Sequence, residues 1–251
     1  MKIRLDILLL ERQLAPTRQK AQALIGAGQV LVNGQVMDKA GSPVDAGSQV
    51  EVRGSPIPYV SRGGLKLAAG LRHFHLHPAG LVCADVGAST GGFTDCLLQN
   101  GARKVYALDV GYGQLDWKLR QDPRVVVMER TNARHLKPGD LPEPLDLAVI
   151  DASFISLKLL IPPLLPLFRG PVAIVALIKP QFEVGRGQVG KGGVVKDPAL
   201  HQRVIGEFRE FAATLGLVSS EPLPSPILGP KGNQEFLILL QTPADQAAVT
   251  S

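Results

Sequence analysis

The chain has 251 residues, 45% of them hydrophobic and 20% charged, which is ordinary for a packed soluble protein. Two cysteines exclude a disulfide framework. No apolar stretch is long enough to span a membrane, because residues 148–168 are interrupted by Asp151, Lys158 and three prolines. The net charge is +5, and residues 1–66 carry nine Lys or Arg against five Asp or Glu. We expect a reduced, cytoplasmic protein without a signal peptide, and a polyanionic partner for its first quarter.

Residues 1–54 have the pattern of a small α+β module. An amphipathic helix is expected around Leu5–Leu9, and a second begins at Pro16 and ends at Gly26. Short strands and a hairpin turn follow. The strands are expected at Val30–Val32, at Val36 and at Gln49–Val52, with the turn at Asn33–Gly34.

This segment resembles the RNA-binding module named after small-subunit ribosomal protein S4. The matching residues are Arg4-Leu-Asp, Arg18, Ala21 and Gly28-x-Val30-x-Val32-Asn33-Gly34. The resemblance implies that basic side chains here contact RNA phosphates, which supply affinity rather than sequence choice. We expect these contacts from Arg4, Arg12, Arg18 and Lys20, and from Arg62 beyond the module. The alternative for any single charge is a solvated helix face.

Residues 55–61 are expected to form a linker, because two prolines disfavour both a helix and a central strand. Ser61 is then expected to cap a helix that contains Lys66 among leucines. A surface lysine with its stem along the helix is the alternative for Lys66.

A glycine-rich turn follows the apolar run Leu81–Val86, which is typical of a buried parallel strand. Glycines at 87, 91 and 92 leave room for a ligand between the turn and the helix that continues to Gln99. A dinucleotide fingerprint would need glycine where Ser89 stands, which favours a ligand without pyrophosphate, such as S-adenosylmethionine.

Two other interpretations of this turn remain open. Gly87-Ala-Ser89-Thr-Gly91 fits a nucleophile elbow, but the only downstream histidines, His135 and His201, are in no recognisable catalytic setting. A plain strand-to-helix turn without a ligand is also possible. Asp109 favours the cofactor, because it ends the next strand about 20 residues after the glycines, where such folds place the acid that binds ribose hydroxyls.

Strands and helices alternate from Leu81 onward, which predicts an α/β fold with a doubly wound, mostly parallel, Rossmann-like sheet. The expected strands are Leu81–Val86, Val105–Asp109, Val125–Met128, Leu145–Ile150, Val172–Ile178 and Phe236–Leu240, and the expected helices are Thr94–Gln99, Phe154–Leu160 and Ala199–Leu215. Ligands of such sheets bind outside the carboxyl ends of the strands. Asp151 and Lys179 each follow an apolar strand directly. We interpret them as functional residues, and the alternative is a structural ion pair between neighbouring strands.

The whole chain resembles the haemolysin-A-like (TlyA) rRNA methyltransferases, in which this module precedes an FtsJ-like ribose methyltransferase domain, expected here at residues 62–251. The segments that carry the resemblance are Ser61–Leu67, Asp85–Phe93, Asp109–Leu115, Glu129–Arg134, Asp151–Leu157, Lys179–Gly185 and Asn233–Phe236. The resemblance implies a catalytic tetrad of Lys66, Asp151, Lys179 and Glu235. It also implies S-adenosylmethionine as cofactor, with contacts from Asp85, Gly87, Ser89, Gly91, Asp109 and Asn132.

The implied reaction is 2′-O-methylation of a nucleotide, expected to be a cytidine of large-subunit rRNA, and it requires no metal. We expect Lys179 to remove or orient the 2′-hydroxyl proton, with Lys66 as a second ammonium nearby and two carboxylates holding both. A ribosome-binding assembly factor without turnover is the alternative function. A membrane-lytic role has no support in the sequence, which lacks a spanning segment.

The stretch from Gly185 to Gly192 nearly matches a P-loop, but Gly192 replaces the Ser or Thr that binds magnesium. We expect residues 185–196 to form a mobile basic loop that contacts RNA through Arg186, Lys191 and Lys196, or else a plain connection.

Overall fold

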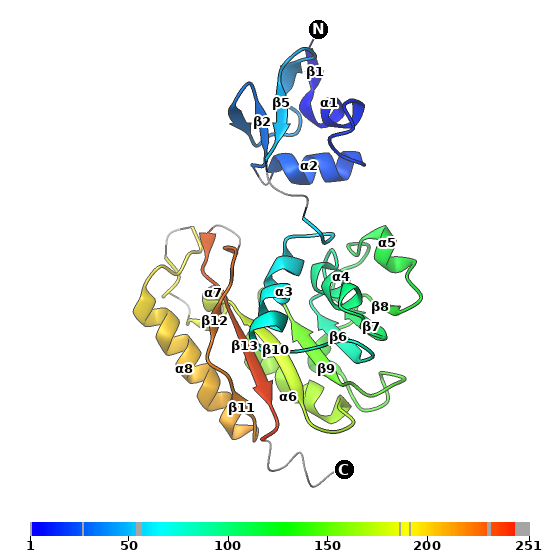
Figure 1. The fold of residues 1–251 in the computed structure, drawn as a ribbon. Helices are drawn as coiled ribbons and strands as arrows, with labels where there is room; N and C mark the ends of the chain where they lie inside the picture. Colours follow the sequence, from blue (N-terminus) through cyan, green and yellow to red (C-terminus); the bar gives the residue numbers. More distant parts are fainter. Residues whose placement is uncertain are drawn as a thin grey trace. The chain divides into compact units, whose positions relative to one another are not determined.

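The computed structural model describes residues 2–26, 28–53, 57–185, 187–190, 192–229 and 232–243. Its contacts divide the chain into two compact units, Met1–Ile57 and Pro58–Ser251, so that the division falls inside the predicted linker. Figure 1 shows the fold of each unit.

The first unit is the small α+β module that the sequence predicts (Figure 1). Its helices are α1 (Leu5–Glu11) and α2 (Arg18–Gly26), and its strands are β1 (Lys2–Arg4), β2 (Val30–Val32), β3 (Gln35–Met37), β4 (Pro43–Asp45) and β5 (Val50–Val52). The antiparallel sheet has the order β3-β2-β5, and both Asn33 and Gly34 have positive φ, as a tight hairpin turn requires. Strands β1 and β4 pair with each other and were not predicted, because three residues give no periodic signal.

The second unit is built on a twisted, mostly parallel sheet (Figure 1), which confirms the predicted fold class. The described strands have the order β11-β13-β10-β9-β6-β7-β8, with β12 also paired to β13. The parallel strands are β6 (Val82–Val86), β7 (Lys104–Leu108), β8 (Val125–Met128), β9 (Leu147–Ile150) and β10 (Ala173–Ile178); β11 (Val218–Ser219), β12 (Leu223–Pro224) and β13 (Phe236–Gln241) are antiparallel to their neighbours. The strand order reverses between β6 and β9, which is where doubly wound sheets bind ligands.

Successive residues of each buried strand point into two different apolar layers. One layer lies under α3 (Gly63–His73) and α4 (Gly92–Gln99), and it contains Leu67, Cys83 and Leu97. The other lies under α6 (Ile161–Leu164) and α8 (Pro198–Thr214), and it contains Ala84 and Phe208. Both faces of the sheet are therefore covered, and only its edges and strand ends can present polar groups to a ligand.

Two local predictions were wrong. The expected helix at Phe154–Leu160 is replaced by a 3-10 helix at Leu157–Leu159 and by α6, because Phe154 has a φ of +64° and the prolines of residues 162–163 fit the first turn of α6. The Ser61 side chain does not cap α3, and Arg62 occupies the cap position without a side-chain bond. Ser61 instead packs against Gly92, where an added Cβ would lie 2.2 Å from the Ser61 Oγ.

The remaining helices are short. They are α5 (Trp117–Arg120), α7 (Pro180–Glu183) and two further 3-10 helices at Ala133–His135 and Leu165–Leu167. Within the described ranges, every helix is too short or too polar to cross a lipid bilayer.

Candidate active site

Two adjoining cavities open at the carboxyl ends of the central strands. The larger has a volume of about 610 Å³ and lies between the start of α3, the glycine turn and the loop that contains Gly229. The smaller, of about 360 Å³, lies between the glycine turn and the end of β7. Gly87, Ser89, Asp151 and Ser153 line both cavities, so the two spaces meet at these residues.

The glycine turn gives the cavities their shared wall. Gly87 has a φ of +86°, and a Cβ there would lie 2.9 Å from the carbonyl oxygen of Asp151 on the neighbouring strand end. Ser89 also has positive φ, and its backbone N–H donates to Asp109 Oδ2 at 2.7 Å. Asp109 Oδ1 accepts a second bond from the N–H of Gly111 at 2.7 Å, so Asp109 holds the turn after β6 against the loop after β7. Asn132 lies in the same smaller cavity, where its side chain accepts a bond from the N–H of Arg134.

Asp85 and Gly91, which we predicted to contact the cofactor, line neither cavity. Asp85 is fully buried, and its Oδ2 accepts bonds from the backbone N–H and the hydroxyl of Thr94 at 2.8 and 2.6 Å. Gly91 has a φ of +95°, and a Cβ there would lie 2.2 Å from Leu119. Both residues therefore support the glycine turn, and their contact with the cofactor stays a prediction.

Burial raises the pKa of Asp85 to about 7, with the two Thr94 bonds opposing this effect. A raised pKa in the folded state means that Asp85 favours folding below its ordinary pKa of 3.8, and that this contribution is lost as the pH rises through 7. We therefore expect wild type to lose stability relative to Asp85→Asn between pH 4 and pH 7, by up to roughly 4 kcal/mol at about 1.4 kcal/mol per pH unit. Urea unfolding of both proteins at each pH measures this difference, and parallel pH profiles would contradict it.

Lys66 and Glu235 form a buried ion pair beside the larger cavity. Lys66 extends from α3, and its Nζ lies 2.6 Å from Oε2 of Glu235, which immediately precedes β13 and is fully buried. The burial of Lys66 excludes the solvent-exposed alternative for this residue. Glu235 Oε1 has no hydrogen-bond partner among the described residues.

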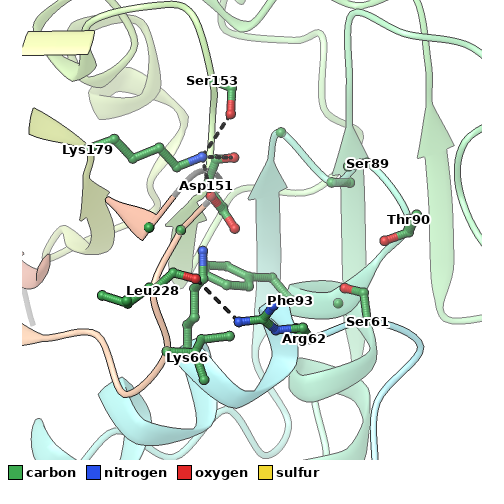
Figure 2. A pocket seen from close by; sticks show the side chains of 17 residues that line it. Ser61, Arg62, Lys66, Ser89, Thr90, Phe93, Asp151, Ser153, Lys179 and Leu228 are labelled. Carbon is green, nitrogen blue, oxygen red and sulfur yellow. Dashed lines mark hydrogen bonds and ion pairs between the residues drawn. The ribbon is translucent and has the colours of Figure 1, made fainter. Parts of the chain in front are cut away.

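Lys179 and Asp151 form the second pair. They directly follow the neighbouring parallel strands β10 and β9, and the Lys179 Nζ lies 2.5 Å from Asp151 Oδ1. Figure 2 shows this pair with Ser153, whose Oγ accepts a bond from Lys179 at 2.9 Å. The interstrand ion pair that we considered as an alternative is thus present, but it lines the cavity together with Lys66. We did not predict a site role for Ser153 from the sequence. Its place two residues after Asp151 was the available indication that it lies near this pair.

The predicted RNA-contacting arginines of the first unit are held by other groups of that unit. Arg4 and Arg18 each place Nε 3.0 Å from the fully buried carboxylate of Asp6, and these bonds, with Arg4 foremost, hold its pKa well below the usual range. Arg12 donates to the carbonyl oxygens of Ser48 and Ala46. Arg4 and Arg18 stay about half exposed, at 47% and 55%, so they are oriented by Asp6 and still accessible.

Lys20 is half-buried on α2, and Arg62 is exposed at the mouth of the larger cavity, where it donates to the carbonyl of Leu228 at 3.4 Å (Figure 2). Of the predicted basic loop, Lys196 is exposed, whereas Arg186 and Lys191 lie outside the described residues. Among the described residues, His, Cys, Asp and Glu form no group of three or more with metal-ligand geometry.

Comparison with protein families assigns both units. Residues 59–242 match the family model of the FtsJ-like methyltransferases, and residues 3–50 match the S4 domain. The chain belongs to the FtsJ-like methyltransferase family. Its FtsJ-like domain contains both cavities and both ion pairs, and its S4 domain contains Asp6 with Arg4 and Arg18.

Relatives of this FtsJ-like protein match it over two thirds or more of both chains. It is 48% identical to the 16S/23S rRNA (cytidine-2′-O)-methyltransferase TlyA of Mycobacterium tuberculosis, covering 98% of this chain and 92% of that protein. It is 38% identical to the 23S rRNA (cytidine-2′-O)-methyltransferase TlyA of Campylobacter jejuni, covering 71% of this chain and 69% of that protein. A solved structure of a hemolysin-like protein from Streptococcus thermophilus is similar with a TM-score of 0.77 and 41% identity, covering 99% and 95% of the two chains.

Proposed function

We propose that this protein transfers a methyl group from S-adenosylmethionine to the 2′-hydroxyl of a cytidine in ribosomal RNA, and that the RNA is that of the large subunit. The names of the mycobacterial and Campylobacter relatives share the cytidine, the 2′-oxygen and 23S rRNA, which supports this choice. The observation that carries the proposal is the meeting of two lysine–carboxylate pairs at the wall of a cavity that adjoins a second, cofactor-sized cavity.

The smaller cavity fits S-adenosylmethionine in its chemistry. Gly87 leaves backbone exposed where a Cβ would meet the end of β9, so the methionine part of the cofactor can approach the turn closely. Asp109, directly after β7, has carboxylate lone pairs still free to accept bonds from ribose hydroxyls, and Asn132 offers an amide for the adenine. The bound cofactor supplies a methyl group that its sulfonium has already activated.

The protein must therefore supply alignment and a site for the proton, because a ribose hydroxyl is a weak nucleophile. Lys179 is the candidate proton acceptor, since it lines the larger cavity beside the wall shared with the smaller one. Lys66 is fixed by Glu235 as a second cation in the same cavity, where it can orient the hydroxyl oxygen through its N–H donors. Asp151 fixes Lys179 in the same way.

We infer that the S4 domain recruits the RNA. Arg4 and Arg18 are oriented by the buried Asp6 and remain accessible to phosphate, so less conformational entropy is lost when they bind. Phosphate contacts of this kind give affinity and register, whereas the choice of nucleotide rests with the FtsJ-like domain.

The test is incorporation of labelled methyl groups from S-adenosylmethionine into purified 50S and 30S subunits and into their naked rRNAs. We expect incorporation by wild type, and a rate at least about 100-fold lower for Lys179→Ala, because general acid–base groups contribute 10²–10⁴-fold. Lys158→Ala is the matched control, since Lys158 lines neither cavity and contacts Glu207 on the surface. Circular dichroism confirms that each variant is folded.

Mapping of the methylated riboses then identifies the nucleotide. Modification of a 23S cytidine supports the full proposal, and modification of 16S rRNA alone contradicts the choice of subunit. Absence of incorporation by wild type into either subunit would favour the assembly-factor alternative. Full activity of folded Lys179→Ala would remove Lys179 from its proposed role.

A further inference from the structure

Ser153 lies in the Asp151–Leu157 segment, where the sequence analysis gave it no role, yet it occupies a distinctive position. With Gly87, Ser89 and Asp151 it lines both cavities, and its Oγ lies 2.9 Å from the Nζ of Lys179. Ser153 is exposed, whereas the Lys179 side chain is only 7% exposed. A substrate hydroxyl that enters the larger cavity can therefore reach Ser153 more easily than it can reach the lysine nitrogen.

The hydrogen bonds of Lys179 use all of its donors. An ammonium has three N–H groups and no acceptor. In the described part of the chain, the Lys179 Nζ has three acceptors: Asp151 Oδ1 at 2.5 Å, Ser153 Oγ at 2.9 Å and the backbone oxygen of Asp151 at 3.3 Å. The charged lysine thus has neither a free donor nor a lone pair directed at a substrate.

The neutral lysine, which is the form that can accept a proton, has two N–H groups and one lone pair. The carboxylate and the backbone carbonyl of Asp151 only accept hydrogen bonds, so both N–H groups stay with them. A serine hydroxyl can accept or donate, and it is the one partner of Lys179 that can reverse its bond. In the neutral state the lone pair of Lys179 therefore faces the hydroxyl hydrogen of Ser153.

Given the proposed 2′-O-methyl transfer, we propose that the Ser153 hydroxyl is a catalytic proton relay between the ribose 2′-hydroxyl and Lys179. As O2′ bonds to the methyl group and the bond from that methyl group to sulfur breaks, the O2′–H proton passes to Ser153 Oγ. The original Oγ–H proton passes at the same time to the lone pair of Lys179. Serine is thereby regenerated, Lys179 becomes an ammonium with three satisfied N–H groups, and no other reactant is needed.

The experiment compares single-turnover methylation by wild type, Ser153→Ala and Ser153→Thr on the subunit that wild type modifies. We expect Ser153→Ala to be at least about 10-fold slower, and the hydroxyl of Ser153→Thr to restore most of the rate. Ser156→Ala is the matched control, because Ser156 lies in the same loop, lines neither cavity and bonds to Glu183. Calorimetric titration with S-adenosylmethionine separates a loss of cofactor binding from a loss of rate.

A proton inventory in mixtures of light and heavy water distinguishes a relay from a structural role. If two protons are transferred in the same step, the rate of wild type depends on the deuterium fraction along a curve. Ser153→Ala lacks the relaying hydroxyl, so we expect its rate to depend on the deuterium fraction linearly. A linear or absent dependence in wild type overturns the relay, as does a Ser153→Ala rate within about 3-fold of wild type. The failure of the two proposals can be told apart. An inactive wild type refutes the proposed reaction, whereas an active wild type with an unaffected Ser153→Ala refutes only the relay.

Discussion

Gly87→Ala is expected to lower methyl transfer by at least about 100-fold while the protein stays folded, since a displacement of about 1 Å near reacting groups has such an effect. The added Cβ would lie 2.9 Å from the backbone oxygen of Asp151, closer than real contacts allow. That oxygen accepts a bond from Lys179, so relief of the clash moves the lysine as well as the cofactor wall. Single-turnover methylation and calorimetric binding of S-adenosylmethionine measure the two losses.

Gly80→Ala is the matched control for this prediction. Gly80 also has a positive φ, of +78°, but an added Cβ meets nothing within 4 Å. Both substitutions therefore carry the left-handed backbone cost of about 1–2 kcal/mol, and only Gly87→Ala adds the clash. Equal activity of the two variants would show that the contact between Gly87 and the end of β9 has no catalytic importance.

Gly229→Ala is expected to reduce methyl transfer by a similar factor, about 100-fold, through the Lys66–Glu235 ion pair. An added Cβ would lie 2.1 Å from Glu235 Oε1 and 2.4 Å from its Cδ. Glu235 is fully buried and bonded to Lys66, so its carboxylate can move only by leaving the lysine. An unpaired buried charge destabilises a protein, by about 3–5 kcal/mol in well-buried pairs, so thermal stability should fall as well.

Gly170→Ala supplies the control for this second variant. Gly170 is exposed, has no positive φ and leaves an added Cβ free of contacts within 4 Å. We expect wild-type activity and stability from it. Wild-type activity of Gly229→Ala would mean that the Lys66–Glu235 pair tolerates displacement and is not needed in its observed geometry.

Much of the second unit could be predicted from the chain alone, because buried parallel strands give continuous apolar runs and glycines mark the turn between strand and helix. Asp109, Asp151 and Lys179 were found as candidates for the same reason, since polar residues directly after such runs must lie at one edge of the sheet. The prediction of a helix at Phe154–Leu160 was wrong. The apolar residues there belong to a loop, in which Phe154 has a positive φ, and to a 3-10 helix, and α6 with its prolines follows.

The sequence by itself determined the two-unit organisation and the strand ends, and through motif resemblance it predicted the four charged residues of the candidate site. Only the tertiary structure decided which charges pair. Lys66 and Glu235 are 169 positions apart in the sequence, and they come together because the sheet places β13 beside β10. It also showed that Asp85 bonds to Thr94 beneath the glycine turn, and that Ser153 bonds to Lys179. The physical reason is that hydrophobic periodicity encodes which face of an element is buried, whereas polar contacts depend on neighbours that distant parts of the chain supply.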